Sequence, residues 1–115
     1  MGLELLNYNK ALERIGGDAE FLAELLTDLV HQVDDNMEIL KQAVINNDYE
    51  NLKTLSHSLK GASANLNVTR LAAHFLQLED LGTGHNTEGA FELLHLVSLD
   101  RNKLEQFLNT GKLPQ

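Results

Sequence analysis

The feature that most constrains the fold is a long run of apolar residues spaced three and four apart, which begins just after a glycine pair. The pair is Gly16-Gly17, and Asp18, which follows it, can cap a new helix. The apolar positions of the run are Phe21, Leu22, Leu25, Leu26, Leu29, Val30, Val33, Met37, Leu40 and Val44. At about 100° per residue they fall on one broad helical face. The run therefore predicts a long amphipathic helix from residue 19 to INND at 45–48.

Shorter periodic segments follow this helix. Asp48 can cap a second helix over 49–66, whose apolar seam is expected at Leu52, Leu55, Leu59, Ala62 and Leu66. Asn67 suits a turn, since asparagine tolerates left-handed backbone geometry. A third helix then carries Val68, Leu71, Ala72, Phe75, Leu76 and Leu78. The sequence GTGHNT at 82–87 predicts a loop, and a last helix is expected over about 88–109.

A short helix before Gly16 brings the expected total to five. Aromatic residues make up only 5% of the 115 residues, and no alternating β-branched run suggests a strand. Amphipathic helices joined by short connections pack as antiparallel neighbours. The predicted fold is therefore all-α, an antiparallel up-down four-helix bundle with a short N-terminal capping helix, and residues 1–115 are expected to form one domain.

Composition and charge exclude several classes of function. The net charge of −8 argues against nucleic acid as a partner. The chain has no cysteine, which excludes disulfides and thiolate metal sites and fits a cytoplasmic location. No apolar run approaches the roughly 20 residues of a membrane span, and MGLELLNYNK does not have the pattern of a signal peptide. No two histidines show metal-ligand spacing on one face, so we expect neither a metal nor a cofactor.

One histidine stands out by its neighbours. On a helical wheel, the apolar seam of 49–66 lies roughly 175° from His57, so this histidine is expected to face outward. The residues beside it on that face are Lys53, Lys60, Gly61 and Ala64. A glycine in an exposed helix interior costs about 1 kcal/mol relative to alanine. Breaking a local rule beside a titratable residue suggests a functional reason, namely room for another molecule.

This constellation favours phosphoryl chemistry. A neutral imidazole is a good nucleophile, and nearby ammonium groups can offset the charge of an attached phosphoryl group. The chain has no nucleotide-binding motif, so the donor must bring its own nucleotide or metal machinery. The other histidines lack such support: acidic residues surround His31, His74 is expected at the edge of an apolar face, and neither His85 nor His95 has a supporting cluster.

The segment SHSLKGASANLNVTRLAAHFLQLED at 56–80 closely resembles the signature of histidine-containing phosphotransfer (HPt) domains, and ALERIGGDAEFLAELL at 11–26 is similar to the family's entry into its first long helix. The resemblance implies a non-enzymatic phosphorelay carrier, in which His57 takes a phosphoryl group from a receiver-domain aspartate and passes it to another receiver. It implies that Lys60 stabilises the phosphoryl group and that Gly61 gives the receiver room. Ala64 and Lys53 complete the expected partner-binding face. Ser56 and Asn67 depart from the family's usual alanine and glycine.

The next helix suggests a supporting residue. Because it folds back at Asn67, Gln77 and Glu79 lie about as far from the turn as His57 does. We expect Glu79 or Gln77 to orient the imidazole through its non-reacting nitrogen, or to pair with Lys60. The alternative is a purely structural hydrogen bond or exposure at the end of the helix.

Two rival functions stay open: a helical adaptor that binds receivers without accepting phosphate, and a metal- or cofactor-binding bundle enzyme. If the chain is a phosphorelay carrier, its partners are receiver domains that hold the Mg²⁺, with a hybrid sensor kinase in cis as a further candidate.

Overall fold

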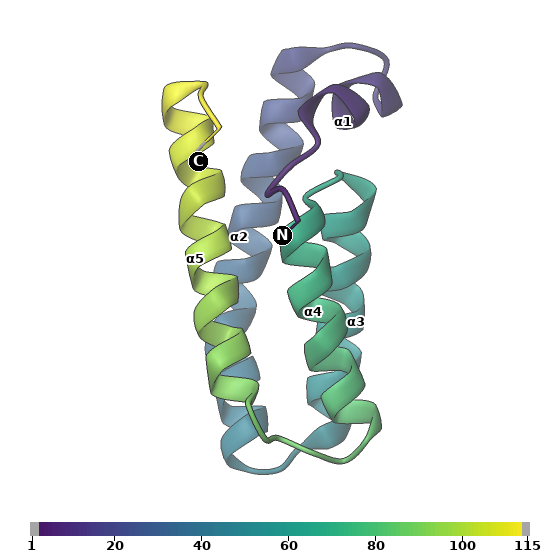
Figure 1. Ribbon diagram of the computed structural model, residues 1–115, viewed down its shortest axis with the longest axis vertical. Helices are drawn as coiled ribbons and strands as arrows, with labels where there is room; N and C mark the ends of the chain where they lie inside the picture. Colours follow the sequence, from purple (N-terminus) through teal and green to yellow (C-terminus); the bar gives the residue numbers. More distant parts are fainter. Residues whose placement is uncertain (1–2, 114–115) are drawn as a thin grey trace.

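The computed structural model describes residues 3–113, and within them the chain forms five helices and no strands. The helices are α1 (Tyr8–Arg14), α2 (Ala19–Ile45), α3 (Tyr49–Asn65), α4 (Thr69–Thr83) and α5 (Ala90–Thr110). Figure 1 shows α2 to α5 side by side, each antiparallel to the next, with α1 near the end where α2 begins. The predicted all-α bundle with a short N-terminal helix is confirmed.

Local capping explains where α2 and α3 begin. The side chain of Asp18 accepts from the backbone N–H of Phe21 at 3.0 Å, and Asp48 accepts from that of Asn51 at 3.1 Å. The turn between α3 and α4 is made by Asn67, whose φ of 56° lies in the left-handed region that asparagine tolerates. These three boundaries agree with the sequence prediction.

The predicted loop at 82–87 is wrong at its start, because α4 continues through Gly82 to Thr83. Gly82 is buried where α4 crosses α3, and a Cβ on it would lie 2.7 Å from the backbone nitrogen of Lys53. The glycine therefore serves close helix packing rather than a turn. The last helix begins at Ala90, two residues later than expected, because Gly89 precedes it with a φ of 78°.

The buried face of α3 also differs from the predicted seam. Leu52 and Leu59 are buried as expected, but Leu55, Ala62 and Leu66 are only partly buried. Two serines, Ser56 and Ser63, are instead completely buried. The reason is that α3 packs against two neighbours, α2 and α4, and a wheel drawn from the leucines alone finds only part of that surface.

The N-terminal segment holds the end of the α3–α4 pair. Arg14 in α1 donates from Nη1 to the carbonyls of Ala64 and Asn65, each at 3.2 Å, and so caps the last turn of α3. The backbone N–H of Asn7 donates to the carbonyl of Asn67 at 2.9 Å. Helix α1 is thereby docked on the closed end of the hairpin formed by α3 and α4.

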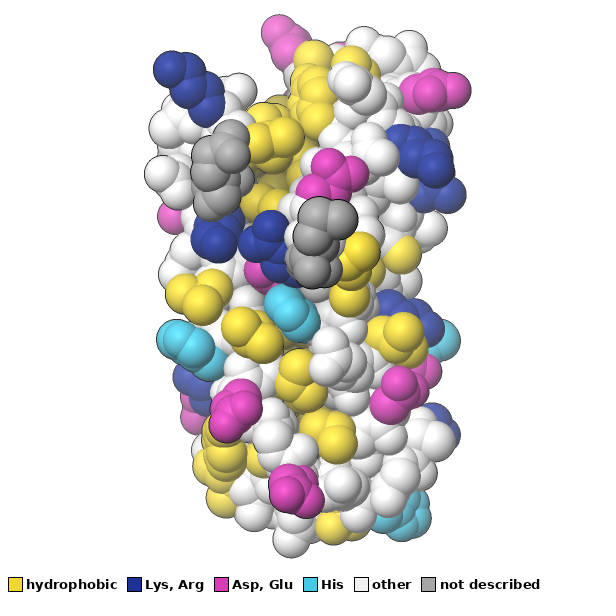
Figure 2. All heavy atoms as spheres, in the orientation of Figure 1, with side chains coloured by type: hydrophobic (Ala, Val, Ile, Leu, Met, Phe, Trp, Pro, Cys, Tyr) yellow, Lys and Arg dark blue, Asp and Glu magenta, His cyan; other side chains and the backbone are white. Residues whose placement is uncertain are grey.

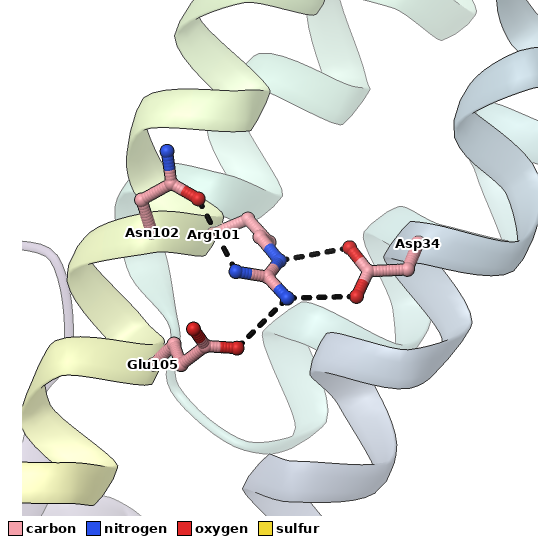
Figure 3. A network of polar contacts seen from close by, with 4 residues as sticks. All are labelled: Asp34, Arg101, Asn102 and Glu105. Atoms are coloured by element: carbon pink, nitrogen blue, oxygen red, sulfur yellow. Dashed lines mark hydrogen bonds and ion pairs between the residues drawn. The ribbon is translucent and has the colours of Figure 1, made fainter.

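Ion pairs connect α5 to the helices on either side of it. Figure 3 shows Arg101 of α5 reaching Asp34 of α2, with both nitrogen–oxygen distances at 2.8 Å, and pairing with Glu105 one turn further along α5. On the other side of α5, the buried carboxylate of Asp100 contacts His74 of α4 at 2.5 Å and Arg70 at 3.8 Å. Within residues 3–113, no helix is long and apolar enough to cross a membrane.

Candidate functional site

His57 lies in the middle of α3 and points away from the bundle core. Its side chain is 66% exposed, the highest exposure of any side chain in the ion pairs of the described residues. Leu52 and Leu59, which anchor this stretch of α3, are buried on the opposite side. The outward direction follows from helix geometry, since the spacing of the buried residues leaves His57 on the far face.

A carboxylate from the neighbouring helix holds the imidazole. Glu79 of α4 lies with Oε2 at 2.9 Å from Nδ1 of His57 and with Oε1 at 3.0 Å from Nζ of Lys60. One carboxylate thus joins the histidine to the lysine one turn along α3. The Lys60 contact is an ion pair rather than a well-aligned hydrogen bond, since Oε1 has no partner with hydrogen-bond geometry.

The protonation state of Glu79 determines which ring nitrogen of a neutral His57 carries the proton. Contact with Lys60 lowers the pKa of the Glu79 carboxyl, partial burial opposes this, and the contact with His57 lowers it further. An ionised carboxylate can only accept a hydrogen bond, so Nδ1 of a neutral His57 must carry the proton and donate it. The lone pair then belongs to Nε2, which has no partner within residues 3–113.

The surface of α3 beside the His57 ring includes two small residues, Gly61 and Ala64. A Cβ added to Gly61 would meet no atom within 4 Å, so the space beside this glycine is open. Ala64 is exposed one further turn along α3, where its carbonyl accepts from Arg14. Lys53 is exposed and makes no ion pair with the described part of the chain. The two small residues leave a shallow shelf beside the imidazole.

The structure separates the two candidate supporting residues. Glu79 contacts His57, whereas Gln77 lines a hollow between α4 and α5 on the other side of α4. Apolar and acidic side chains share that hollow, among them Leu93, Leu96, Glu88 and Glu92. Figure 2 shows this face, with apolar side chains along its middle and acidic ones towards its lower part. The negative charge of Glu88 and Glu92 in this hollow would repel a phosphoryl group.

A second histidine–carboxylate pair escaped the sequence interpretation. His74 contacts the buried Asp100, which also pairs with Arg70, in an arrangement that parallels His57, Glu79 and Lys60. Burial raises the pKa of the Asp100 carboxyl, against the opposing effects of His74 and Arg70. The side chain of His74 is only 14% exposed. The sequence feature that could have indicated this pair is Asp100 itself. This acid lies three residues after Val97 and four before Leu104, on the buried face of its helix, where a carboxylate needs a partner.

A comparison with protein families matches residues 24–110 to the Hpt domain. The chain belongs to the Hpt domain family. Hpt domains carry phosphoryl groups on histidine in phosphorelays, act as signalling modules rather than classical enzymes, and interact with receiver domains of response regulators. The resemblance seen in the sequence is thereby confirmed. No curated protein and no solved structure matches the chain.

The match to the Hpt domain spans every candidate residue from Lys53 to Glu79. Among residues 3–113 of this Hpt domain, no three His, Cys, Asp or Glu side chains gather in a way that could hold a metal ion. The remaining exposed histidines lack the His57 arrangement: the ring of His85 stacks on Tyr49 with centroids 5.0 Å apart, and neither His31 nor His95 has a carboxylate partner in the described chain.

Proposed function

We propose that His57 accepts a phosphoryl group from the aspartyl phosphate of one receiver domain and passes it to the aspartate of another. The observation that supports this most directly is the pairing of an exposed imidazole with Glu79 through Nδ1, which leaves Nε2 facing solvent as the nucleophile. His74 has a similar carboxylate partner, but its low exposure would keep a receiver's active site from reaching it.

The bonds formed and broken in this transfer balance, and the only leaving group is the receiver's aspartate. The Nε2 lone pair of neutral His57 forms the N–P bond while the P–O bond to the receiver aspartate breaks, and the aspartate departs as a carboxylate. The Nδ1 proton stays in place, so the phosphorylated ring carries a positive charge that the Glu79 carboxylate stabilises from 2.9 Å. Transfer to the second receiver reverses these bond changes.

Lys60 supplies positive charge beside the reacting nitrogen. It lies three residues after His57, a spacing that places the two side chains side by side on a helix. Its side chain is 28% exposed and paired to Glu79, so its ammonium group is held near the imidazole rather than extended into solvent. We assign it the role of offsetting the charge of the phosphoryl group. The Mg²⁺ belongs to the receiver.

The open shelf at Gly61 and Ala64 fits the approach of a receiver domain. A receiver must bring its phosphorylated aspartate to within reach of Nε2, and side chains beside the imidazole would obstruct it. We therefore assign Gly61 and Ala64 to the contact surface, with Lys53 at its edge.

The test is transfer of radiolabelled phosphate from a phosphorylated receiver domain. We expect acid-labile label on the wild type, none on His57→Gln, and near wild-type label on His74→Gln, which is the matched control for a histidine with a carboxylate partner. Persistent label in His57→Gln, or its loss in His74→Gln alone, contradicts the assignment. A receiver that binds while His57 stays unlabelled supports the adaptor function instead.

A further inference from the structure

We propose that Gly82 is a positioning residue for the phosphoacceptor: by letting α4 pass directly against the α3 backbone, it keeps Glu79 within hydrogen-bond reach of His57. The inference deepens the proposed function and depends on it only for the effect on transfer. Its structural part, the link between Gly82 and the His57–Glu79 contact, stands independently.

The contact at Gly82 is between backbones. A Cβ on Gly82 would lie 2.7 Å from the backbone nitrogen of Lys53 and 2.9 Å from its Cα. These atoms belong to the body of α3, so they cannot move aside as the end of a flexible side chain could. Any side chain at this position would force the two helices apart. Gly61 offers the opposite case, since a Cβ there would meet nothing within 4 Å.

The contact lies next to the site along the helix pair. Lys53 precedes His57 by one turn in α3, and Glu79 precedes Gly82 by about one turn in α4. The other end of the pair is closed by the turn at Asn67, which the backbone of Asn7 holds. The hairpin is thus fixed at Asn67 and kept narrow at Gly82, with the His57–Glu79 contact between the two and close to Gly82.

The distances at Gly82 set how far Glu79 would move away from His57 in Gly82→Ala. To reach an ordinary contact of about 3.5 Å, the added Cβ must retreat by about 0.8 Å. Glu79 lies 12 residues from Asn67 and Gly82 lies 15, so a hinge at the turn moves Glu79 by about 0.6 Å. The 2.9 Å bond to His57 would then lengthen to about 3.5 Å, beyond ordinary hydrogen-bond range.

Both partners of the Glu79 carboxylate belong to α3, which makes the site sensitive to the spacing of the helices. When α4 retreats, the contacts with His57 and Lys60 lengthen together, because neither partner travels with Glu79. The carboxylate is also mostly buried, at 18% side-chain exposure, so it has limited freedom to follow.

The experiment is long-range ¹H–¹⁵N NMR of the imidazole rings in Gly82→Ala at pH 8, well above the ordinary histidine pKa of about 6.5. Wild type should show His57 with Nδ1 protonated, and Gly82→Ala should lose that single tautomer. Phosphotransfer from a receiver should fall by up to about tenfold, which is the loss expected when Glu79 no longer orients the imidazole. An unchanged His57 tautomer in Gly82→Ala overturns the proposal.

The matched control is Leu104→Ala, which removes a fully buried side chain from α5 and leaves the Gly82–Lys53 contact intact. It should lower the melting temperature yet keep Nδ1 of His57 protonated, and loss of the tautomer there as well would overturn the proposal. If Gly82→Ala is partly unfolded, the spectra are recorded with trimethylamine N-oxide, which favours the folded state. A changed tautomer without phosphotransfer in wild type would support the role of Gly82 while the proposed function fails.

Discussion

The imidazole of His57 on α3 donates through Nδ1 to the carboxylate of Glu79 on α4, over 2.9 Å. The two residues are 22 positions apart in the chain and come from antiparallel helices. The contact fixes the tautomer of an otherwise mobile ring and directs Nε2 to solvent. The tautomer of the exposed histidine is therefore set by a residue of the neighbouring helix.

Replacing Glu79 should slow phosphotransfer. In metal sites, losing the group that orients a functional histidine costs about 10- to 100-fold, and we expect about tenfold for Glu79→Ala. Glu79→Gln should be milder, because its amide oxygen can still accept from Nδ1. Single-turnover transfer from a phosphorylated receiver measures both. Equal rates for wild type and Glu79→Ala would mean that the contact is only structural.

The same carboxylate should contribute to stability in a pH-dependent way. The folded-state pKa of Glu79 is below its usual value of 4.5, chiefly because of Lys60, so its contribution is present above that value and is lost as the pH falls through the folded pKa. Glu79→Gln should therefore be less stable than wild type at pH 7, and the difference should shrink in acid. Urea unfolding at pH 7, 5 and 3.5 checks this, and a constant difference would contradict it.

Gly61→Ala should separate stability from function. Alanine at an open helical position stabilises by up to about 1 kcal/mol, and no atom obstructs the new Cβ. The methyl group would nevertheless stand on the shelf that the receiver approaches, so phosphotransfer should slow. Urea unfolding and the transfer assay, run on the same preparation, test both directions. A variant that is more stable and transfers at the wild-type rate would exclude Gly61 from the contact surface.

The two buried serines of α3 should respond differently to alanine. The Ser56 hydroxyl is buried without a hydrogen-bond partner in the described chain, whereas that of Ser63 donates to the carbonyl of Leu59 at 2.7 Å. A buried unpaired polar group costs about 1–3 kcal/mol, so Ser56→Ala should stabilise the fold by about 1 kcal/mol. Ser63→Ala should destabilise it by about 0.5–1 kcal/mol. Chemical unfolding measures both, and equal effects would argue against this distinction.

The ion pair between Asp34 and Arg101 should contribute little, and less in salt. The Asp34 side chain is 42% exposed, so the bidentate contact is screened by solvent, and Asp34→Asn should lower the unfolding free energy by at most about 1 kcal/mol. In 1 M NaCl the difference should decrease, because the Debye length falls to about 3 Å. A loss that does not change with salt would indicate that packing, rather than charge, is what the substitution removes.

The sequence by itself determined the local features of the site. Helix caps at Asp18 and Asp48 predicted where α2 and α3 begin, and helical periodicity placed His57 on the face opposite Leu52 and Leu59. These properties depend on residues within a few positions of one another, and an α-helix has a constant 3.6 residues per turn. A wheel is therefore sufficient to predict them.

Only the tertiary structure decided what meets His57. Gln77 and Glu79 lie 10 and 12 residues after Asn67, close to the level of His57 along the hairpin. The crossing of α4 over α3 brings Glu79 to the imidazole, while Gln77 lines the hollow between α4 and α5. That crossing depends on how the surfaces of the two helices fit together. The absence of a side chain at Gly82 affects this fit as well as the packing of the leucines does. Periodicity within one helix carries no information on how closely another helix approaches, which is why Gly82 was predicted to lie in a loop.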